Sequence, residues 1–589
     1  MSSHDPLAAS PRSASHPPAP ASGADGAGTV SRRAALAGLG IAPVVGAAAG
    51  LPVAHAESTP QKGAAAGQAV IRTSQPRQTI RGVGGINFPE WIPDLTPAQR
   101  ETAFGTEEGQ LGFAVLRIPV SDRRETWGLQ LETALRAQEH GAIVFASPWY
   151  PPQEMRETFR REEPGGAGSP FPAEEAQRLE GVRVATGVSG YRGEGYVVPT
   201  TDSGAVISWD AVTAYRTAPY RLSIRYALPS QPAHLQVRVN GDVIATELEL
   251  PATASAKDWQ EVEVDVPFEA GGNAVELVTV DGRPAVDGIR VRRIEVQEDA
   301  MRLRHDAYPA YAQHLQDFVT FMRENGVDLH AISIQNEPDY AHEWTWWTPA
   351  EMVDFLENHA GAIDCRIIAP ESFQYLKDTS DPIIRSEAAW ANVDILGAHL
   401  YGTQPDAFEY PLFHENTGDR ELWMTEVYVP NSEPDSNERW PESLVVGESI
   451  HDAFVVAEFQ AYVWWYIRRN YGPISEDGSI SHRGHVMSHF SRFLRAGSQR
   501  LVLDGDGTDG VRESAYRAAD GSLVIVAINS SEAPLTRTYE LAGMRPASVE
   551  AWRTSAEERS AVVDAPVIDS TGALRGELPA QSITTCVVR

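Results

Sequence analysis

The sequence predicts an α/β protein: a (β/α)8 barrel of the TIM type with a side β-domain and an inserted β-sandwich. Short apolar runs separated by helix-like stretches indicate a buried parallel sheet. Eight such runs lie between residues 82 and 465, and eight strands are enough to close this barrel. The alternation stops over residues 171–297 and again after residue 497, where strand patterns without helices follow.

The composition indicates a globular protein of several domains. Its 589 residues exceed one ordinary core and predict two to four domains. The formal net charge of -31 excludes a nucleic-acid binder of the usual basic kind. Cys365 and Cys586 are the only two cysteines, too few for a disulfide framework or a cysteine-based zinc site. We expect both to be free thiols.

Residues 1–56 are expected to be a disordered extension followed by an export signal. Arg32 and Arg33 precede a weakly apolar stretch, and a small-x-small pattern ends at Ala56. This arrangement resembles a twin-arginine signal and predicts a secreted protein that is cleaved near Ala56. No segment is apolar enough to favour a membrane span, so we expect no membrane partner.

The barrel is expected to come from two stretches of the chain, residues 82–164 and 301–496. The predicted strands are residues 82–86, 113–119, 142–146, 331–334, 366–370, 393–397, 422–425 and 462–465. A helical face runs from Tyr311 to Met322, and Gly326 can end that helix. Thr348 begins another helix with a capping box.

Two β-rich regions accompany the barrel. Residues 171–297 alternate apolar and polar side chains, and Asn240-Gly241 follows one run as a strong hairpin signal. Residues 497–589 form the side β-domain, which strands within residues 57–81 complete. The insertion falls between the third barrel strand and its helix. Because βα loops lie on the catalytic face, we expect it near the active-site mouth.

Two carboxylates stand where the fourth and seventh barrel strands end, at Glu337 and Glu426. Both should project into the mouth of the barrel. Glycosidic cleavage needs a protonated acid for the leaving oxygen and a second carboxylate at the anomeric carbon. A separation of roughly 5–5.5 Å lets the second attack directly and retains configuration. The pair therefore predicts a retaining glycoside hydrolase with no cofactor for catalysis.

Six motifs carry a resemblance to a known family: residues 82–87, 145–149, 334–340, 394–402, 422–432 and 459–469. They resemble glycoside hydrolase family 30, and within it the bacterial glucuronoxylanases of subfamily 8. The resemblance implies Glu337 as acid/base and Glu426 as nucleophile. It also implies a cleavage subsite lined by Asn336, Trp149, Tyr401 and Trp465, with Trp91 nearby.

The resemblance further implies a device that binds a glucuronate side group of xylan. Its positions fall on Tyr428, Ser432, Tyr466 and Arg469. A guanidinium can hold a carboxylate through two parallel hydrogen bonds, while hydroxyls orient the sugar. We therefore expect a monomeric, endo-acting enzyme that cuts glucuronoxylan beside these side groups. Glu433 departs from the family pattern, and its carboxylate would oppose glucuronate binding.

The insertion resembles a carbohydrate-binding module of family 35 or 6. Such modules often hold a structural calcium, and Glu175 and Asp287 are the predicted ligands because carboxylate oxygens suit that ion. Trp259 is expected in the core of the sandwich rather than in a sugar platform. Whether the module binds sugar or only shapes the cleft stays open.

Two other functions remain open. The first is a xylanase or another β-glycosidase without glucuronate dependence. The second is a non-catalytic polysaccharide-binding protein in which the inserted module dominates. The presence of both Glu337 and Glu426 argues against the second.

Overall fold

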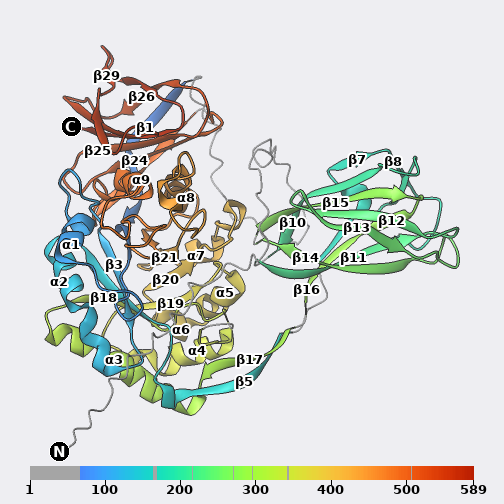
Figure 1. Cartoon of the computed structure of the whole chain (residues 1–589), viewed down its shortest axis with the longest axis horizontal. Coiled ribbons are helices and arrows are strands. Elements are labelled where there is room, and N and C mark those ends of the chain that lie inside the picture. Colours follow the sequence, from blue (N-terminus) through green and yellow to red (C-terminus); the bar gives the residue numbers. More distant parts are fainter. Residues whose placement is uncertain are drawn as a thin grey trace, which may run out of the picture.

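The computed structural model describes residues 67–163, 169–214, 217–269, 271–294, 296–340, 344–505 and 507–589. It contains a barrel with a β-domain packed on one side and a β-sandwich held out on another (Figure 1). The predicted disordered extension and export signal lie outside the described residues. Within these residues no helix has the length and apolarity that a membrane crossing needs.

In the part of the chain that the structure describes, eight parallel strands close a barrel in the order β18-β19-β20-β21-β22-β2-β3-β4. These are β2 (Gly82–Ile86), β3 (Val115–Val120), β4 (Ile143–Pro148), β18 (Leu329–Ser333), β19 (Ile367–Ser372), β20 (Ile395–His399), β21 (Glu421–Val427) and β22 (Ala461–Trp464). Each predicted strand overlaps one of them, which confirms the barrel. The strands read as apolar runs because both of their faces are buried.

The helices are α1 (Pro97–Phe104), α2 (Leu131–Glu139), α3 (Tyr308–Glu324), α4 (Pro349–Asn358), α5 (Lys377–Arg385), α6 (Glu387–Ala391), α7 (Pro411–Asn416), α8 (Leu444–Val455) and α9 (His482–Ser491). Both predicted cap signals are confirmed. Thr348 accepts a hydrogen bond from the Glu351 N–H, and the Glu351 side chain accepts one in return. Gly326 follows α3 with a φ of 85°, a left-handed conformation that glycine adopts without strain.

The side β-domain is one sheet in the order β28-β27-β31-β25-β24-β23-β1-β26-β30-β29. Its strands are β1 (Gln68–Ile80), β23 (Ser498–Asp504), β24 (Val511–Arg517), β25 (Leu523–Asn529), β26 (Leu535–Ala542), β27 (Val549–Thr554), β28 (Ala561–Val563), β29 (Val567–Ile568), β30 (Leu574–Leu578) and β31 (Ser582–Val588). β1 pairs with β23 and β26, so an N-terminal strand completes the domain as predicted. Tyr516, Val526 and Ile583 belong to the same apolar cluster as the barrel, which joins the two parts through a continuous core.

The inserted sandwich consists of two facing sheets with a core of its own. One sheet contains β7 (Arg178–Glu180), β10 (Val206–Ala214), β12 (Ala233–Val239), β13 (Asp242–Leu250) and β15 (Gly271–Asp281). The other contains β6 (Ser169–Pro172), β8 (Val182–Ala185), β9 (Tyr196–Pro199), β11 (Ala218–Ala227), β14 (Gln260–Phe268) and β16 (Ala285–Arg293). Asn240 and Gly241 both have positive φ between β12 and β13, which confirms the predicted hairpin.

The prediction that Trp259 lies in the core of the sandwich is wrong. It is only half-buried. Its indole N–H donates to the Ser189 carbonyl at 3.1 Å, and the Arg225 guanidinium lies 5.2 Å from its ring. Trp259 precedes the first residue of β14, so the alternation that turns side chains into the sandwich does not govern it.

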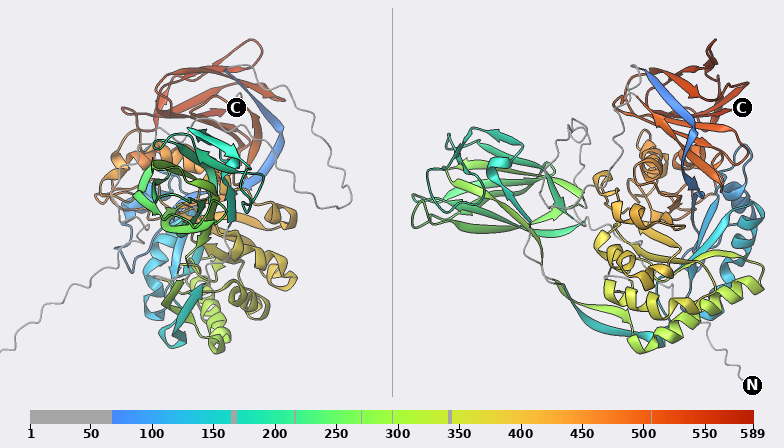
Figure 2. Two further views of the ribbon diagram at one scale, coloured as in Figure 1. Left: turned by 90° about the vertical axis from the view of Figure 1, so that its right-hand side faces the viewer. Right: turned by 180° about the vertical axis from the view of Figure 1, so that it is seen from behind.

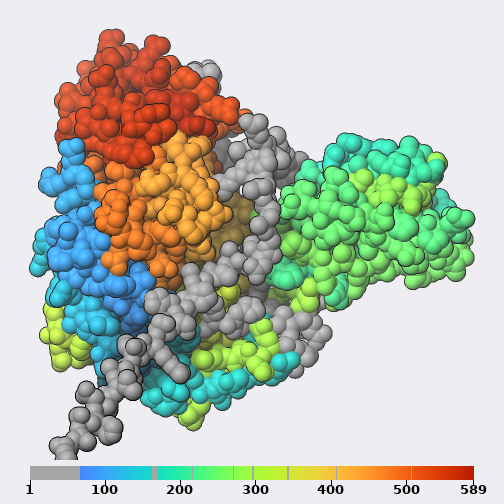
Figure 3. Space-filling model, viewed as in Figure 1, coloured from blue at the N-terminus to red at the C-terminus, as the bar shows by residue number. Residues whose placement is uncertain are grey.

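A two-stranded stem carries the sandwich. β5 (Arg156–Glu163) and β17 (Val296–Leu303) pair antiparallel and link the sandwich to the barrel between β4 and α3. Figures 1 and 2 show the stem as a long ribbon, and Figure 3 shows the sandwich as a separate lobe. The sandwich returns to the barrel where the Thr217 N–H donates to Gln374 Oε1 at 2.6 Å. Gln374 follows β19, so this contact lies beside the predicted mouth.

Cys365 and Cys586 are both free thiols, as predicted. Burial raises the pKa of each to about 12, so neither is a reactive thiolate at neutral pH.

Candidate active site

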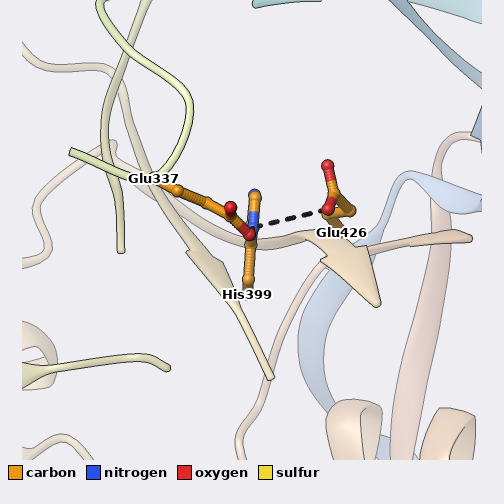
Figure 4. A group of neighbouring side chains, drawn as sticks. All are labelled: Glu337, His399 and Glu426. Carbon is orange, nitrogen blue, oxygen red and sulfur yellow. Dashed lines mark hydrogen bonds and ion pairs between the residues drawn. The ribbon is translucent and has the colours of Figure 1, made fainter. Parts of the chain in front are cut away.

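Glu337 and Glu426 meet at the carboxyl ends of the barrel strands. Glu337 follows β18, Glu426 lies in β21, and His399 ends β20 between them (Figure 4). One oxygen of each glutamate and one nitrogen of His399 lie within 4.8 Å of one another. The nearest carboxylate oxygens are therefore no more than 4.8 Å apart, which is close to the roughly 5–5.5 Å of retaining glycosidases and shorter than the roughly 6.5–9.5 Å of inverting ones.

The backbone at Glu337 is held in an uncommon conformation. Glu337 has a φ of 47° and Glu371, at the end of β19, a φ of 58°. Side chains other than glycine seldom adopt these left-handed values, which occur at sites that the surrounding structure over-determines. The Asn336 N–H donates to the Pro148 carbonyl at 2.8 Å, and the Glu337 N–H donates to the Glu371 carbonyl at 3.1 Å. These bonds fix where the Glu337 carboxyl points.

Glu337 is surrounded by groups that leave its charged form poorly solvated. Burial, with a smaller contribution from the nearby Glu426, raises the pKa of Glu337 to about 7 against the opposing effects of His399 and Trp344. The His399 Nδ1 lies 2.8 Å from Glu337 Oε1, and the Trp344 indole N–H donates to Oε2 at 2.6 Å. A carboxyl with this pKa can give up and take back a proton near neutral pH.

His399 carries charge in the same cluster. Burial would lower its pKa, but Glu426 and Glu337 together raise it to about 9. The imidazole is therefore protonated at neutral pH and donates its Nδ1 hydrogen to Glu337.

Glu426 is held by donors of a different kind. The Arg117 guanidinium donates from Nη1 to Glu426 Oε2, and the Tyr401 hydroxyl donates to Oε1 at 2.9 Å. Each carboxylate oxygen thus accepts one hydrogen bond, Oε2 from a cation and Oε1 from a hydroxyl. These two bonds hold the carboxylate in a fixed position, which direct attack on a sugar carbon requires.

Arg117 and Glu371 were missed in the sequence. Arg117 lies in β3, is fully buried, and also donates from Nη2 to Asn336 Oδ1 at 2.7 Å and to Glu371 Oε1 at 3.2 Å. Burial alone would raise the pKa of Glu371, but Arg117 lowers it to about 2. The available signals were an arginine inside the apolar run 113–119 and a glutamate at the end of the fifth strand.

Aromatic side chains line the space beside the two glutamates. Trp91 lies 5.8 Å from Trp149 and 6.1 Å from Trp465, and Trp149 lies 6.0 Å from Trp465. Among the described residues, Asn336 Nδ2 and the Trp465 indole N–H have no hydrogen-bond partner although both are buried. Buried donors normally find a partner, so these two are available to hydroxyls of a bound sugar. The predicted subsite residues are therefore brought together.

Of the residues predicted to bind glucuronate, Tyr466 and Arg469 follow β22, whereas Tyr428 and Ser432 follow β21. The Arg469 guanidinium lies 5.4 Å from the Tyr466 ring, and Tyr428 packs edge-on to Tyr401 at 5.2 Å. Tyr428 therefore packs against Tyr401, the residue whose hydroxyl donates to Glu426. Arg469 Nη1 lies 3.9 Å from Glu476, a loose pair in which Arg469 is half-buried and Glu476 is exposed. Ser432 is half-buried in the loop after β21.

Two neighbours of this subsite are engaged elsewhere. Arg468 donates to Gln99 Oε1 at 2.9 Å and to the Pro93 carbonyl at 2.6 Å, so it anchors a loop. The Glu433 carboxylate is exposed and accepts from Arg439 Nη1 at 2.5 Å. Arg439 compensates the negative charge of Glu433. The expected repulsion between Glu433 and a bound glucuronate is therefore reduced.

The predicted calcium ligands do not fit a cation as they stand. Glu175 is exposed, whereas Asp287 is buried, pairs with the Arg225 guanidinium and accepts from the Arg192 N–H at 2.8 Å. Within the described residues, the acidic and histidine side chains close enough to share a metal are those of Glu337, His399 and Glu426, and not these two. A guanidinium already supplies the positive charge at Asp287, so we assign no calcium to this pair.

Comparisons with known proteins agree with this geometry. Residues 497–586 match the glycosyl hydrolase family 30 beta sandwich domain, and residues 172–297 match carbohydrate binding module family 6. The chain is 41% identical over 526 residues to glucuronoxylanase XynC of Bacillus subtilis, covering 89% of this chain and 92% of that protein.

Solved structures show the same architecture. The GH30 endoxylanase of Clostridium papyrosolvens matches with a TM-score of 0.61 and 28% identity, over 89% of this chain and 100% of that one. The family 30 subfamily 8 xylanase of Clostridium acetobutylicum matches in fold with a TM-score of 0.59 at 22% identity, over 89% of this chain and 100% of that one. The chain belongs to glycoside hydrolase family 30.

Proposed function

We propose that this enzyme is an endo-acting, retaining glucuronoxylanase, with Glu337 as acid/base and Glu426 as nucleophile. The observation that carries the proposal is the pair of buried carboxylates with oxygens within 4.8 Å of one another. Their surroundings support different roles, because Arg117 contacts Glu426 while burial raises the pKa of Glu337 to about 7. A named glucuronoxylanase at 41% identity supports the substrate.

The reaction follows from this arrangement in two steps. Glu426 attacks the anomeric carbon of a xylose unit while Glu337 gives its proton to the glycosidic oxygen, so the leaving chain departs as an alcohol. Glu337, now ionised, then removes a proton from water, which attacks the same carbon and releases Glu426. Two inversions give net retention.

Specificity is assigned to Arg469 with Tyr466, Tyr428 and Ser432. A net charge of -31 repels an acidic polymer at long range, so recognition of a glucuronate needs a local cation. Arg469 has a loosely paired guanidinium, with its Nη1 3.9 Å from Glu476. The hydroxyls of the other three residues suit a sugar acid that must be bound in one orientation.

The products formed from two xylans test the proposal. Purified enzyme is incubated with glucuronoxylan and, separately, with unsubstituted xylan, and the products are identified by mass. We expect oligomers that each carry one glucuronate, with little attack on unsubstituted xylan. Comparable attack on both would favour the alternative of a xylanase without glucuronate dependence. Hydrolysis of neither would favour a non-catalytic polysaccharide-binding protein.

A substitution of Arg469 tests whether this residue provides the specificity for glucuronate. Arg469→Ala should lose most activity on glucuronoxylan and keep its fold. The matched control is Arg323→Ala, which removes an exposed arginine of α3 that pairs with Asp364, and it should behave as the unchanged enzyme. Equal activity of the two variants on glucuronoxylan would show that Arg469 does not bind the glucuronate side group.

The organisation of the mature chain is also a proposal. Residues 1–56 are assigned to a disordered extension with a twin-arginine signal cleaved near Ala56, and the exported enzyme to a monomer. Residues 57–81 and 497–589 would form the side domain, 82–164 and 301–496 the barrel, and 171–297 the inserted module. The mass of the secreted protein and its light scattering test the cleavage site and the monomer.

A further inference from the structure

A short aromatic segment, residues 344–347, lies directly beside the proposed acid/base. Its first residue, Trp344, donates its indole N–H to Glu337 Oε2 at 2.6 Å. The Trp344 ring is buried and stacks on Trp91, with ring centroids 5.8 Å apart and an angle of 16° between the rings. The position of the Trp344 ring therefore determines whether Glu337 Oε2 receives this hydrogen bond.

The stem of the inserted sandwich contacts the same segment. The Trp346 N–H donates to the Met301 carbonyl of β17 at 2.8 Å. The Arg161 guanidinium of β5 lies 4.3 Å from the Trp346 ring, within the range of a cation–π interaction. Arg161 is itself held by Glu298 of β17, with Nη2 and Oε1 2.6 Å apart. Both strands of the stem thus contact Trp346.

The barrel holds the segment from its other side. The Thr345 hydroxyl donates to the Trp149 carbonyl at 3.3 Å, and the Trp347 N–H donates to the Pro338 carbonyl at 2.8 Å. Pro338 is the residue after Glu337. The aromatic segment is therefore fixed between the stem and the backbone that carries the acid/base.

We infer that Trp344 is a positioning residue for Glu337, and that the stem of the inserted sandwich holds Trp344 in place through Trp346. The inference rests on the proposed role of Glu337. The insertion then acts on catalysis through its attachment, besides any sugar that its sandwich binds. A hydrogen bond donated to a carboxylate stabilises the charged form, so loss of the Trp344 bond makes Glu337 a weaker acid.

The basic limb of the pH profile of kcat/KM on xylan measures this effect, because it reports the acid that must be protonated in the free enzyme. Trp344→Phe removes the N–H and keeps a ring, and it should move the limb upward by about one pH unit. The matched control is Trp390→Phe, which likewise removes the N–H of a buried indole, one that donates to the Asn416 carbonyl, and it should leave the limb unmoved. An unmoved limb in Trp344→Phe would overturn the positioning role.

The role of the stem is tested by two arginines on one strand. Arg161→Ala removes the group over Trp346 and should move the limb in the same direction by a smaller amount. The control is Arg160→Ala, which removes an exposed arginine that pairs with Asp299. Equal limbs in Arg161→Ala and Arg160→Ala would overturn the role of the stem and leave that of Trp344.

An aryl xylobioside that carries a glucuronate side group and an activated leaving group separates this inference from the proposed function. Such a leaving group departs without an acid, so Trp344→Phe should release it in a first step as fast as that of the unchanged enzyme, which also shows that the variant is folded. If Glu337→Gln cuts xylan at the original rate, the proposed function fails. If Glu337→Gln is impaired on xylan while the Trp344→Phe limb stays fixed, only the inference fails.

Discussion

The ends of β18 and β21 present the same side chain in two different environments. At β21, Glu426 receives hydrogen bonds from the Arg117 guanidinium and the Tyr401 hydroxyl. At β18, Glu337 meets an indole N–H and an imidazole in an aromatic pocket, where burial raises its pKa to about 7. The difference teaches that neighbours, and not residue type, divide a carboxylate pair into a nucleophile and an acid.

The largest expected effect is that of removing the nucleophile. Glu426→Gln should lower hydrolysis of xylan by roughly 10⁵-fold or more, because an amide cannot attack the anomeric carbon. Release of an activated phenol from a glucuronate-substituted aryl xylobioside should fail equally, since that step also needs the nucleophile. A reducing-sugar assay and a phenol-release assay measure the two reactions, and activity on either substrate near the original rate would refute the assignment.

Removing the acid should have a smaller and more selective effect. Glu337→Gln should slow cleavage of xylan by about 10²–10⁴-fold. The same activated, glucuronate-substituted aryl xylobioside should still give a rapid burst of phenol, because its leaving group needs no proton, and azide should then accelerate turnover by replacing the activated water. Absence of the burst would mean that the two glutamates do not differ in the way proposed.

Arg117 connects the two environments, and its removal should affect stability. Arg117→Met leaves Glu371 and Glu426 buried without their cation, which should lower the free energy of unfolding by about 3–5 kcal/mol. Unfolding in urea measures the change. Arg439→Ala, which breaks an exposed pair, should change it by about 1 kcal/mol or less. Equal losses in the two variants would show that Arg117 does not hold the buried carboxylates.

The pH profile gives the mildest test. Because the pKa of Glu337 is raised to about 7, kcat/KM on xylan should fall above that pH, by about tenfold per pH unit, as the acid loses its proton. With the activated, glucuronate-substituted aryl xylobioside this basic limb should disappear from the first step. A basic limb that is identical for both substrates would show that it reports the ionisation of a group other than Glu337.

Much of the fold could be predicted because its signals are local. The apolar runs located all eight barrel strands, and Thr348 with Glu351 marked the start of α4 from four consecutive residues. The two glutamates could be found for a similar reason, since residues at the ends of barrel strands face the active site.

The remaining features depend on contacts between residues far apart in the chain. Arg117 and Glu371 are separated by 254 positions, and no local pattern predicts their pairing. The calcium prediction at Asp287 gains no support, because Arg225, on the neighbouring strand, already pairs with that carboxylate. Trp259 was misplaced because an indole is apolar over most of its surface, while its N–H partner Ser189 is 70 residues away.

Covalent labelling tests the central claim most directly. The enzyme is incubated with a 2-deoxy-2-fluoro xylobioside that carries an activated leaving group and, on its non-reducing xylose, a glucuronate side group; it is then digested with protease and analysed by mass spectrometry. A retaining mechanism with the assigned roles predicts one glucuronate-bearing fluoro-xylobiosyl group attached to the peptide that contains Glu426. A label on any other residue, or no label together with products of inverted anomeric configuration, would contradict it.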